Sequence, residues 1–179
     1  GCLNNFDVGT AGLIRKDIHS FCRLGGNAKY AGSDLDERMT EIYNSYPDEL
    51  KELIIPSTIP LYNGSGAEDI TRKVFAPTLT MVGCGDNHEA EEGLTWPIFA
   101  GRNNRKKTFN GSAAPWWLSS LNSSDYAWFV STGGSAGHYC PSYSGGVVPA
   151  FIILQSVQID DTPDNDGSYR LTELQSYCS

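Results

Sequence analysis

The stretch PWWLSSLNSSDYAWFVSTGG, residues 115–134, carries the strongest structural signal in this chain. Its apolar residues gather in two short runs, 115–118 and 126–131, which are rich in the aromatic and β-branched residues that favour strands. The Thr-Gly-Gly segment at 132–134 is typical of a turn. The stretch therefore predicts two strands and then a turn into a further extended segment.

Other strand candidates lie on both sides of this stretch. Residues 147–155 form a nearly continuous apolar run, which predicts a central, buried strand with Pro149 at a bulge or beside an unpaired edge. Residues 73–82 and 95–100 are short β-branched or aromatic segments that we also expect to be strands.

Helix signals are concentrated in the first third of the chain. Ser33 begins a weak capping box, and apolar residues then recur at helical spacing. Pro47 should end this helix and begin a second, short one. We predict helices over residues 33–45 and 47–53, and thus an α+β fold in which two early helices precede antiparallel strands.

The composition is that of one globular domain. The chain has 179 residues, of which 40% are hydrophobic and 11% aromatic, and a formal net charge of −8. We expect a single domain over residues 1–159 and an acidic tail over 160–179. The acidic balance argues against a nucleic-acid partner, and no apolar run is long enough to predict membrane insertion.

No motif for catalysis, metal binding or cofactor binding stands out. The histidines sit in no catalytic motif, so we expect no catalytic residues and no enzyme activity. The acidic cluster at 86–92 and the basic run at 102–107 are both expected to be solvated loops. Residues 164–173 match several positions of a calcium-binding loop, but Thr162 stands where its first Asp should be. We therefore predict no metal site and no cofactor.

The cysteines favour free thiols over a disulfide framework, because they are scattered and odd in number. One disulfide with three thiols is the alternative. The five residues are Cys2, Cys22, Cys84, Cys140 and Cys178.

The segment 119–143 has the composition of a binding surface. It is rich in Tyr, Ser, Gly and Asn, with Trp and Phe beside them. Tyrosine offers a large amphipathic contact area at low entropic cost, and the small polar residues adapt their hydrogen bonds. An ordinary hairpin with polar turns is the alternative interpretation of the same composition.

Four motifs, in order, resemble a bacterial and phage domain family of otherwise unknown function. They are WWLSS at 116–120, YAWFVS at 126–131, GGSA at 133–136 and GGVVPAF at 145–151. The family pattern is W-W-L-R-S-P, a YAWYVNSDG-like strand and turn, and then G-V-R-P-A. The upstream segments YAGSDL and VFAPT are also similar to it, so the resemblance covers most of residues 10–155.

This resemblance implies a C-type-lectin-like fold. The family includes variable proteins that retroelements diversify in phages and gut bacteria, where adenine-directed mutagenesis changes chosen surface positions on a fixed scaffold. The variable region would correspond here to residues 116–150. The scaffold would include Trp116, Trp117, Val147, Pro149, Ala150 and Phe151.

The resemblance also implies a ligand-binding display protein, on a virion or outside a cell, that recognises a protein or glycan on a cell surface. A homo-oligomer would add avidity. Many residue types of the implied binding face are reachable from an Asn codon by changing adenines. The candidates are Ser119, Asn122, Ser123, Asp125, Tyr126, Trp128, Ser131, His138, Tyr139, Cys140, Ser142 and Tyr143.

The chain also departs from the family pattern. Val148 stands where the family has Arg, and Ser120 and Leu121 replace the Arg-Ser-Pro ending. The lectin calcium motifs E-P-N and W-N-D are absent, so calcium-dependent sugar binding is not implied. An undiversified structural or carbohydrate-binding surface module is the alternative function, and an oxidative enzyme that uses Cys84 and Cys140 is a further one.

Overall fold

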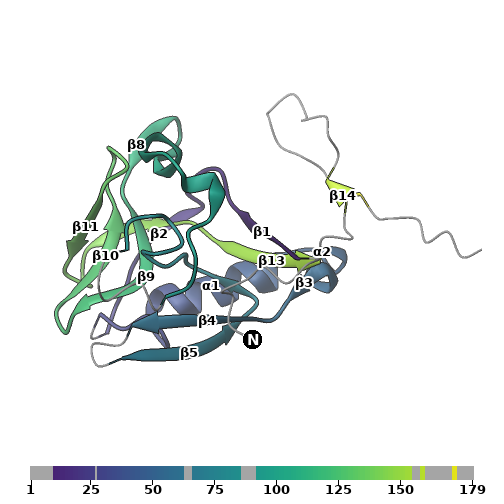
Figure 1. Cartoon of the computed structure of the whole chain (residues 1–179), viewed down its shortest axis with the longest axis horizontal. Helices are drawn as coiled ribbons and strands as arrows, with labels where there is room; N and C mark the ends of the chain where they lie inside the picture. Colours follow the sequence, from purple (N-terminus) through teal and green to yellow (C-terminus); the bar gives the residue numbers. More distant parts are fainter. Residues whose placement is uncertain are drawn as a thin grey trace, which may run out of the picture.

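A computed structural model of the chain describes residues 10–26, 28–62, 66–85, 92–154, 158–159 and 171–172 (Figure 1). The structure is mostly β, with 42% strand and 19% helix. The prediction of an α+β, C-type-lectin-like fold is therefore wrong, because two short α-helices stand against several sheets. Two strands also precede the helices, at Thr10–Ile14 and Ser20–Arg23, where the short segments TAGLI and SFCR have no clear alternation that would predict a strand.

The largest sheet has five strands and contains most of residues 115–134. Its order is β11-β10-β9-β12-β2, and all neighbours pair antiparallel except β9 and β12, which are parallel. The strands are β2 (Ser20–Arg23), β9 (Trp116–Ser123), β10 (Tyr126–Val130), β11 (Ala136–Tyr139) and β12 (Ser144–Val147).

A second sheet has four strands, with β13 (Ala150–Leu154) pairing with all three others. These are β1 (Thr10–Ile14), β3 (Ile54–Ile55) and β6 (Val74–Phe75). Three further two-stranded pairs are β4 (Ser57–Tyr62) with β5 (Ala67–Arg72), β7 (Lys107–Phe109) with β8 (Ser112–Ala114), and β14 (Gln158–Ile159) with β15 (Leu171–Thr172). Most of the predicted tail, 160–170 and 173–179, lies outside the described residues.

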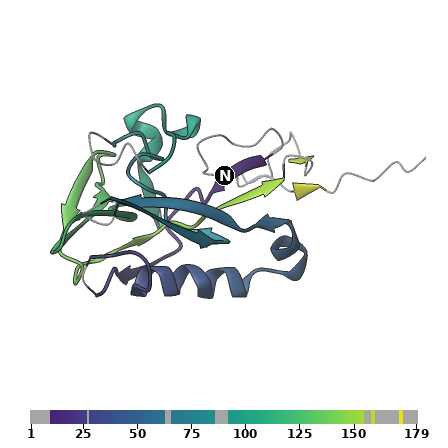
Figure 2. The ribbon, with the colours of Figure 1, turned by 60° about the horizontal axis from the view of Figure 1, so that its bottom comes forward.

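Both helix predictions are confirmed. Helix α1 spans Asp34–Ser45, and the Ser33 side chain caps it by accepting from the Asp36 backbone N–H at 3.2 Å. Helix α2 spans Asp48–Leu53, with Pro47 at its N-cap. Figure 2 shows α1 along one side of the molecule, at the bottom of the view. A bidentate ion pair between Asp36 and Arg72 fastens α1 to β5, with Nη2 and Oδ2 2.6 Å apart.

The strand predictions hold best where the sequence signal is strongest. Strand β10 confirms the run at 126–131, and β9 confirms and extends the run at 115–118. Of residues 73–82, only Val74–Phe75 form a strand. The prediction for 95–100 is wrong, because Pro97 begins a 3-10 helix, η2 (Pro97–Phe99).

The run at 147–155 is not one strand. It divides between β12, in the five-stranded sheet, and β13, in the four-stranded sheet, and Pro149 lies in the link. The Pro149 carbonyl accepts from the Arg15 N–H at 3.0 Å. Proline has no backbone N–H to donate to a neighbouring strand. The link between two sheets suits it because no strand pairing is lost there.

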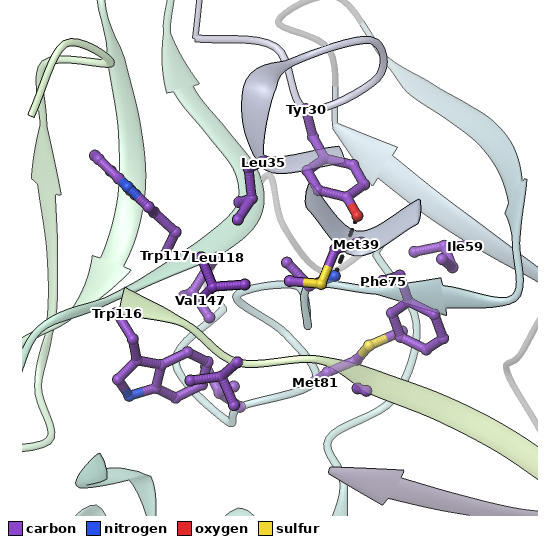
Figure 3. Packing of buried hydrophobic residues seen from close by; sticks show 14 of the residues in the cluster. Tyr30, Leu35, Met39, Ile59, Phe75, Met81, Trp116, Trp117, Leu118 and Val147 are labelled. Atoms are coloured by element: carbon purple, nitrogen blue, oxygen red, sulfur yellow. Dashed lines mark hydrogen bonds between the residues drawn. The ribbon is translucent and has the colours of Figure 1, made fainter. Parts of the chain in front are cut away.

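The core lies between the two main sheets and α1, and it includes the predicted scaffold residues. Figure 3 labels residues of this core from β9 (Trp116, Trp117 and Leu118), from β12 (Val147) and from α1 (Leu35 and Met39). Trp116 and Trp117 are at most 1% exposed, and Ala150 is fully buried. Phe151 is half-buried and packs edge-on against Tyr46, with ring centroids 6.0 Å apart. Among the described residues, none of the helices is long and apolar enough to cross a membrane.

Lys107 shows that part of the basic run is buried. It is 6% exposed, and its Nζ donates to the Arg15 carbonyl at 2.7 Å. Burial lowers the pKa of Lys107 to about 8 from 10.5. The prediction of a solvated loop is therefore wrong at this position, because the ammonium supplies a donor to an interior carbonyl.

The variant Lys107→Met tests the cost of this burial. Between pH 8 and 10.5 the unfolded lysine keeps its proton while the folded one loses it. The unfolded state then binds more protons, so the wild type should gain stability relative to the variant as the pH rises through this window, by up to about 3 kcal/mol. Urea unfolding of both proteins at several pH values measures this gain. The half-buried Cys22 thiol titrates in the same way in both proteins, so its contribution cancels. Stability curves that stay parallel over this pH range would contradict the assignment.

Candidate binding surface

The candidate binding residues lie mainly on β9, β10, β11 and the turns that join them. Strand β10 pairs with β11 so that Trp128 is opposite His138, and Ala127 is opposite Tyr139. Because successive side chains of a strand point to opposite faces, His138 and Tyr139 lie on different sides of the sheet. The structure thus divides the candidates into two groups rather than one surface.

The first group, the Tyr126 cluster, consists of Tyr126, Trp128 and His138. The His138 ring packs edge-on against both others, with centroids 5.4 Å from Tyr126 and 5.8 Å from Trp128. Tyr126 is 45% exposed, whereas Trp128 is half-buried. Asp125, in the adjoining turn, is exposed and accepts from the Ser124 hydroxyl at 3.3 Å.

The second group, the Tyr139 cluster, consists of Phe129, Tyr139 and Tyr143 packed against the buried Trp117. The two tyrosine rings stack with centroids 4.6 Å apart and an interplanar angle of 19°. Tyr139 is 46% exposed and Tyr143 is 43% exposed. Phe129 lies 5.0 Å from Tyr139, and Trp117 lies 6.4 Å from Phe129 and 6.5 Å from Tyr143. A closed ring of aromatic contacts thus joins two exposed tyrosines to the core.

Two glycines allow these rings to lie close to the strands. A Cβ at Gly137 would stand 2.8 Å from Phe129 Cε1, and one at Gly145 would stand 2.7 Å from Trp117 Nε1. Any larger residue at either position would displace a ring that supports the tyrosines. Phe129, Gly137 and Gly145 are not among the predicted binding residues, although a glycine in a strand can mark the close approach of another group.

The turn beside the Tyr139 cluster carries two more candidates. Cys140 and Ser142 are exposed, their Sγ and Oγ atoms are 3.1 Å apart, and the Tyr143 N–H closes the turn on the Cys140 carbonyl at 2.9 Å. The hydrogen bond with the Ser142 side chain lowers the pKa of the Cys140 thiol. Cys140 is free, as are the half-buried Cys22 and Cys84. Cys2 and Cys178 lie outside the described residues.

The remaining candidates are less exposed. Asn122 and Ser123 are half-buried at the end of β9. Ser131 is half-buried and holds the turn before β11, because its hydroxyl accepts from the Ser135 N–H at 3.2 Å. Because these three residues are half-buried, they are better placed to support the surface than to contact a ligand.

A bulge in β9 places the last candidate, Ser119, in the interior. Trp117 pairs with Phe129 and Leu121 pairs with Ala127, so residues 118–120 lie opposite Trp128 alone. The freed Ser119 N–H donates to the Pro77 carbonyl at 3.0 Å. Ser119 is 3% exposed, so it does not share the surface of either aromatic cluster.

Glu92 supports the bulge from within. Its buried carboxylate accepts from the Ser120 hydroxyl, and also from the Tyr62 N–H at 3.0 Å. The Leu79 N–H donates to the same Ser120 hydroxyl at 2.7 Å. The prediction of a solvated acidic loop is thus wrong for Glu92, while residues 86–91 lie outside the described part of the chain.

Two arginines of the basic run fix the turn between β10 and β11. Arg102 Nε donates to the Gly133 carbonyl at 2.9 Å, and Arg105 Nε donates to the Gly134 carbonyl at 3.0 Å. Arg105 also donates to the carbonyls of Val82 and Gly83. Its guanidinium therefore ties together irregular segments whose carbonyls need donors, and the prediction of a merely solvated loop is wrong here too.

The described residues contain no group of three or more His, Cys, Asp or Glu side chains placed to hold a metal ion. In comparisons with known proteins, residues 9–155 match the model of a family described as "Domain of unknown function (DUF6273)". All twelve binding candidates lie within this match. No curated protein and no solved structure matches the chain.

The turn geometry predicts that substitution by alanine costs much more stability at Gly134 than at Gly133. Gly134 has φ +80°, and a Cβ there would stand 2.1 Å from the Arg102 carbonyl oxygen. Gly134→Ala should destabilise the protein by about 2 kcal/mol or more, because backbone atoms would have to move. At Gly133 the nearest atom is the flexible end of the Arg102 side chain, at 3.3 Å, so Gly133→Ala should cost much less. Urea unfolding of the pair measures this, and equal costs would contradict it.

Proposed function

This chain belongs to the DUF6273 family, and we propose that it is a ligand-binding display protein whose Tyr139 cluster contacts a protein or glycan on a cell surface. The observation that carries the proposal is the stacked, exposed pair Tyr139 and Tyr143, braced by Phe129 and the buried Trp117. Exposed aromatic rings that are held in place before binding lose little entropy when a ligand covers them.

The chemistry of the cluster suits recognition rather than a single ligand class. Each tyrosine offers an apolar ring face and a hydroxyl that donates and accepts hydrogen bonds. Exposed Cys140 and Ser142 in the adjoining turn add small polar contacts beside the rings. A flat apolar patch of a protein or the C–H face of a sugar ring would both fit such a platform. Presentation on a virion or a cell surface, in several copies, would add avidity.

We further propose that a retroelement diversifies this surface. The exposed residues Tyr139, Cys140, Ser142 and Tyr143 are all of types reachable from an Asn codon through adenine changes, as is the exposed Asp125 beside the Tyr126 cluster. Trp117, on which they rest, is not of these types, although Phe129 is. A changeable surface above a fixed tryptophan is what diversification without unfolding requires.

Substitutions in the two aromatic clusters test which surface binds. Tyr139→Ala and Tyr143→Ala should each weaken binding about tenfold or more, whereas Tyr126→Ala, equally exposed but on the other face, should change it less than about twofold. Labelled wild-type protein is first applied to a glycan array and to intact bacterial cells, and the strongest binder is then titrated with each variant. Loss of binding only in Tyr126→Ala would move the site to the other cluster. Absence of binding to every probe would favour a passive structural module.

The DNA beside the gene tests diversification separately. We expect a near-copy of the codons for residues 116–150 that differs mainly at adenines, close to a reverse-transcriptase gene. The mismatched codons should fall at the exposed candidates and spare Trp117, Phe129 and Gly137, because changes there would displace the supporting rings. Absence of both the copy and the gene would favour an undiversified binding or structural module.

A further inference from the structure

Strand β11 is a free edge of the five-stranded sheet. Within the described residues it pairs with β10 alone, and Figure 1 shows it as the outermost strand of this sheet. Edge strands usually carry a charged side chain, a proline or a bulge that prevents pairing with another chain. Strand β11 has a regular register and no proline, and residues 126–147 contain no Lys, Arg, Asp or Glu. Its sequence and geometry therefore permit the addition of another strand.

The backbone of β11 presents hydrogen-bonding groups at this edge. The Ser131 N–H donates to the Ser135 carbonyl at 2.8 Å, which makes these two residues a hydrogen-bonded pair. Hydrogen-bonded pairs alternate along antiparallel strands, so Gly137 bonds to β10, whereas the N–H and C=O groups of Ala136 and His138 point away from it. Among the described residues, no backbone or side-chain group bonds to these outward groups.

The edge sequence Ser-Ala-Gly-His-Tyr, residues 135–139, is complementary to itself. Two copies of β11 related by a two-fold axis at Gly137 would pair antiparallel, with Ala136 of each copy opposite His138 of the other. These are the residues whose N–H and C=O groups point outward, so each would exchange both of its backbone hydrogen bonds with the second copy. A two-fold axis also makes the interface closed, because each copy uses the same edge.

The side chains fit this register better than its neighbours. On one face the large His138 lies opposite the small Ala136 of the second copy, and on the other face Tyr139 lies opposite Ser135. An axis shifted to His138 would place the two imidazole rings opposite each other. An axis shifted to Ala136 would place each imidazole opposite Gly134, which is buried in the turn.

The Phe129 ring adds an apolar contact at the centre of the edge. Its Cε1 and Cζ atoms lie 2.8 and 2.9 Å from the position of a Cβ at Gly137, so the tip of the half-buried ring covers the middle of β11. Opposite residues of a non-hydrogen-bonded pair have Cβ positions about 4.5–5.5 Å apart. An axis at Gly137 would therefore bring the two Phe129 rings into contact and bury their exposed edges.

We propose that β11 pairs antiparallel with β11 of a second copy of this chain, with the two-fold axis at Gly137, so that the two five-stranded sheets become one continuous sheet. The axis is perpendicular to the sheet, and both Tyr139 clusters therefore lie on the same face of the dimer. The interface does not depend on the proposed recognition function. Where that function holds, the dimer presents two binding surfaces to one cell surface, which adds avidity.

The concentration dependence of the assembly and of amide exchange tests the interface without any substitution. Sedimentation equilibrium of the full chain, from micromolar to millimolar concentration, should show a reversible monomer–dimer equilibrium. Hydrogen exchange of the Ala136 and His138 amides should slow about tenfold once about nine-tenths of the chains are dimeric. The Gly137 amide, which already bonds to β10, should be protected in both samples. A chain that stays monomeric throughout, or unchanged exchange at Ala136 and His138, would overturn the proposal.

Two variants at one position test the outward hydrogen bonds. Ala136→Pro removes an N–H that points away from β10, so the strand should still pair with β10 while the dimer loses half of its backbone hydrogen bonds. Its dimer Kd should rise about tenfold or more. Ala136→Ser keeps the N–H and a small side chain, and its Kd should stay within about twofold of the wild type. Circular dichroism and urea unfolding check folding, and a folded Ala136→Pro that dimerises like the wild type would overturn the proposal.

Discussion

Strand β9 buries two adjacent tryptophans, one on each face of the five-stranded sheet, and the remaining parts of the molecule are arranged around them. Trp116 stacks on Phe99 with centroids 6.4 Å apart, and its indole N–H donates to the Arg105 carbonyl at 2.9 Å. The Trp117 indole N–H donates to the Cys22 carbonyl at 3.2 Å, across the sheet in β2. Both large rings are buried without leaving an unpaired donor, which is the condition for a tryptophan in a core. The Trp116 ring thereby fixes the 3-10 helix η3 (Arg102–Arg105), and the Trp117 ring fixes the edge strand β2.

The proposed binding surface is an extension of the second of these rings. Contacts run from Trp117 through Phe129 to Tyr139 and Tyr143, so that the exposed tyrosines rest on a residue that is 1% exposed. Surface side chains normally lose conformational entropy when a ligand binds. Because the two tyrosine rings are already held by their neighbours, part of that entropy is lost on folding instead. The proposed diversification would change the exposed tyrosines and leave Trp117 in place.

Charged residues of the middle of the chain form hydrogen bonds with other groups of the protein and are not simply solvated. Arg105 donates to three carbonyls, Lys107 donates to a fourth, and Glu92 accepts from Ser120 and a backbone N–H. The charge runs around all three predict solvated loops, because runs of charge usually face water. The irregular segments around them leave backbone groups without ladder partners, and these groups are satisfied by charged side chains instead. Only the packing of segments distant in sequence shows which backbone groups need them.

Local sequence patterns predict the α1 cap at Ser33, the break at Pro47 and the aromatic strand β10, because capping, proline geometry and strand composition act over a few residues. The family resemblance adds the expectation that Tyr139 and Tyr143 face a ligand, and both are exposed. Long-range packing accounts for the mostly β architecture, the change of sheets at Pro149, the bulge that buries Ser119, and the division of the candidates between two faces. Each of these depends on which strand lies beside which, and strand pairing is set by contacts between residues far apart in the chain, which no local pattern encodes.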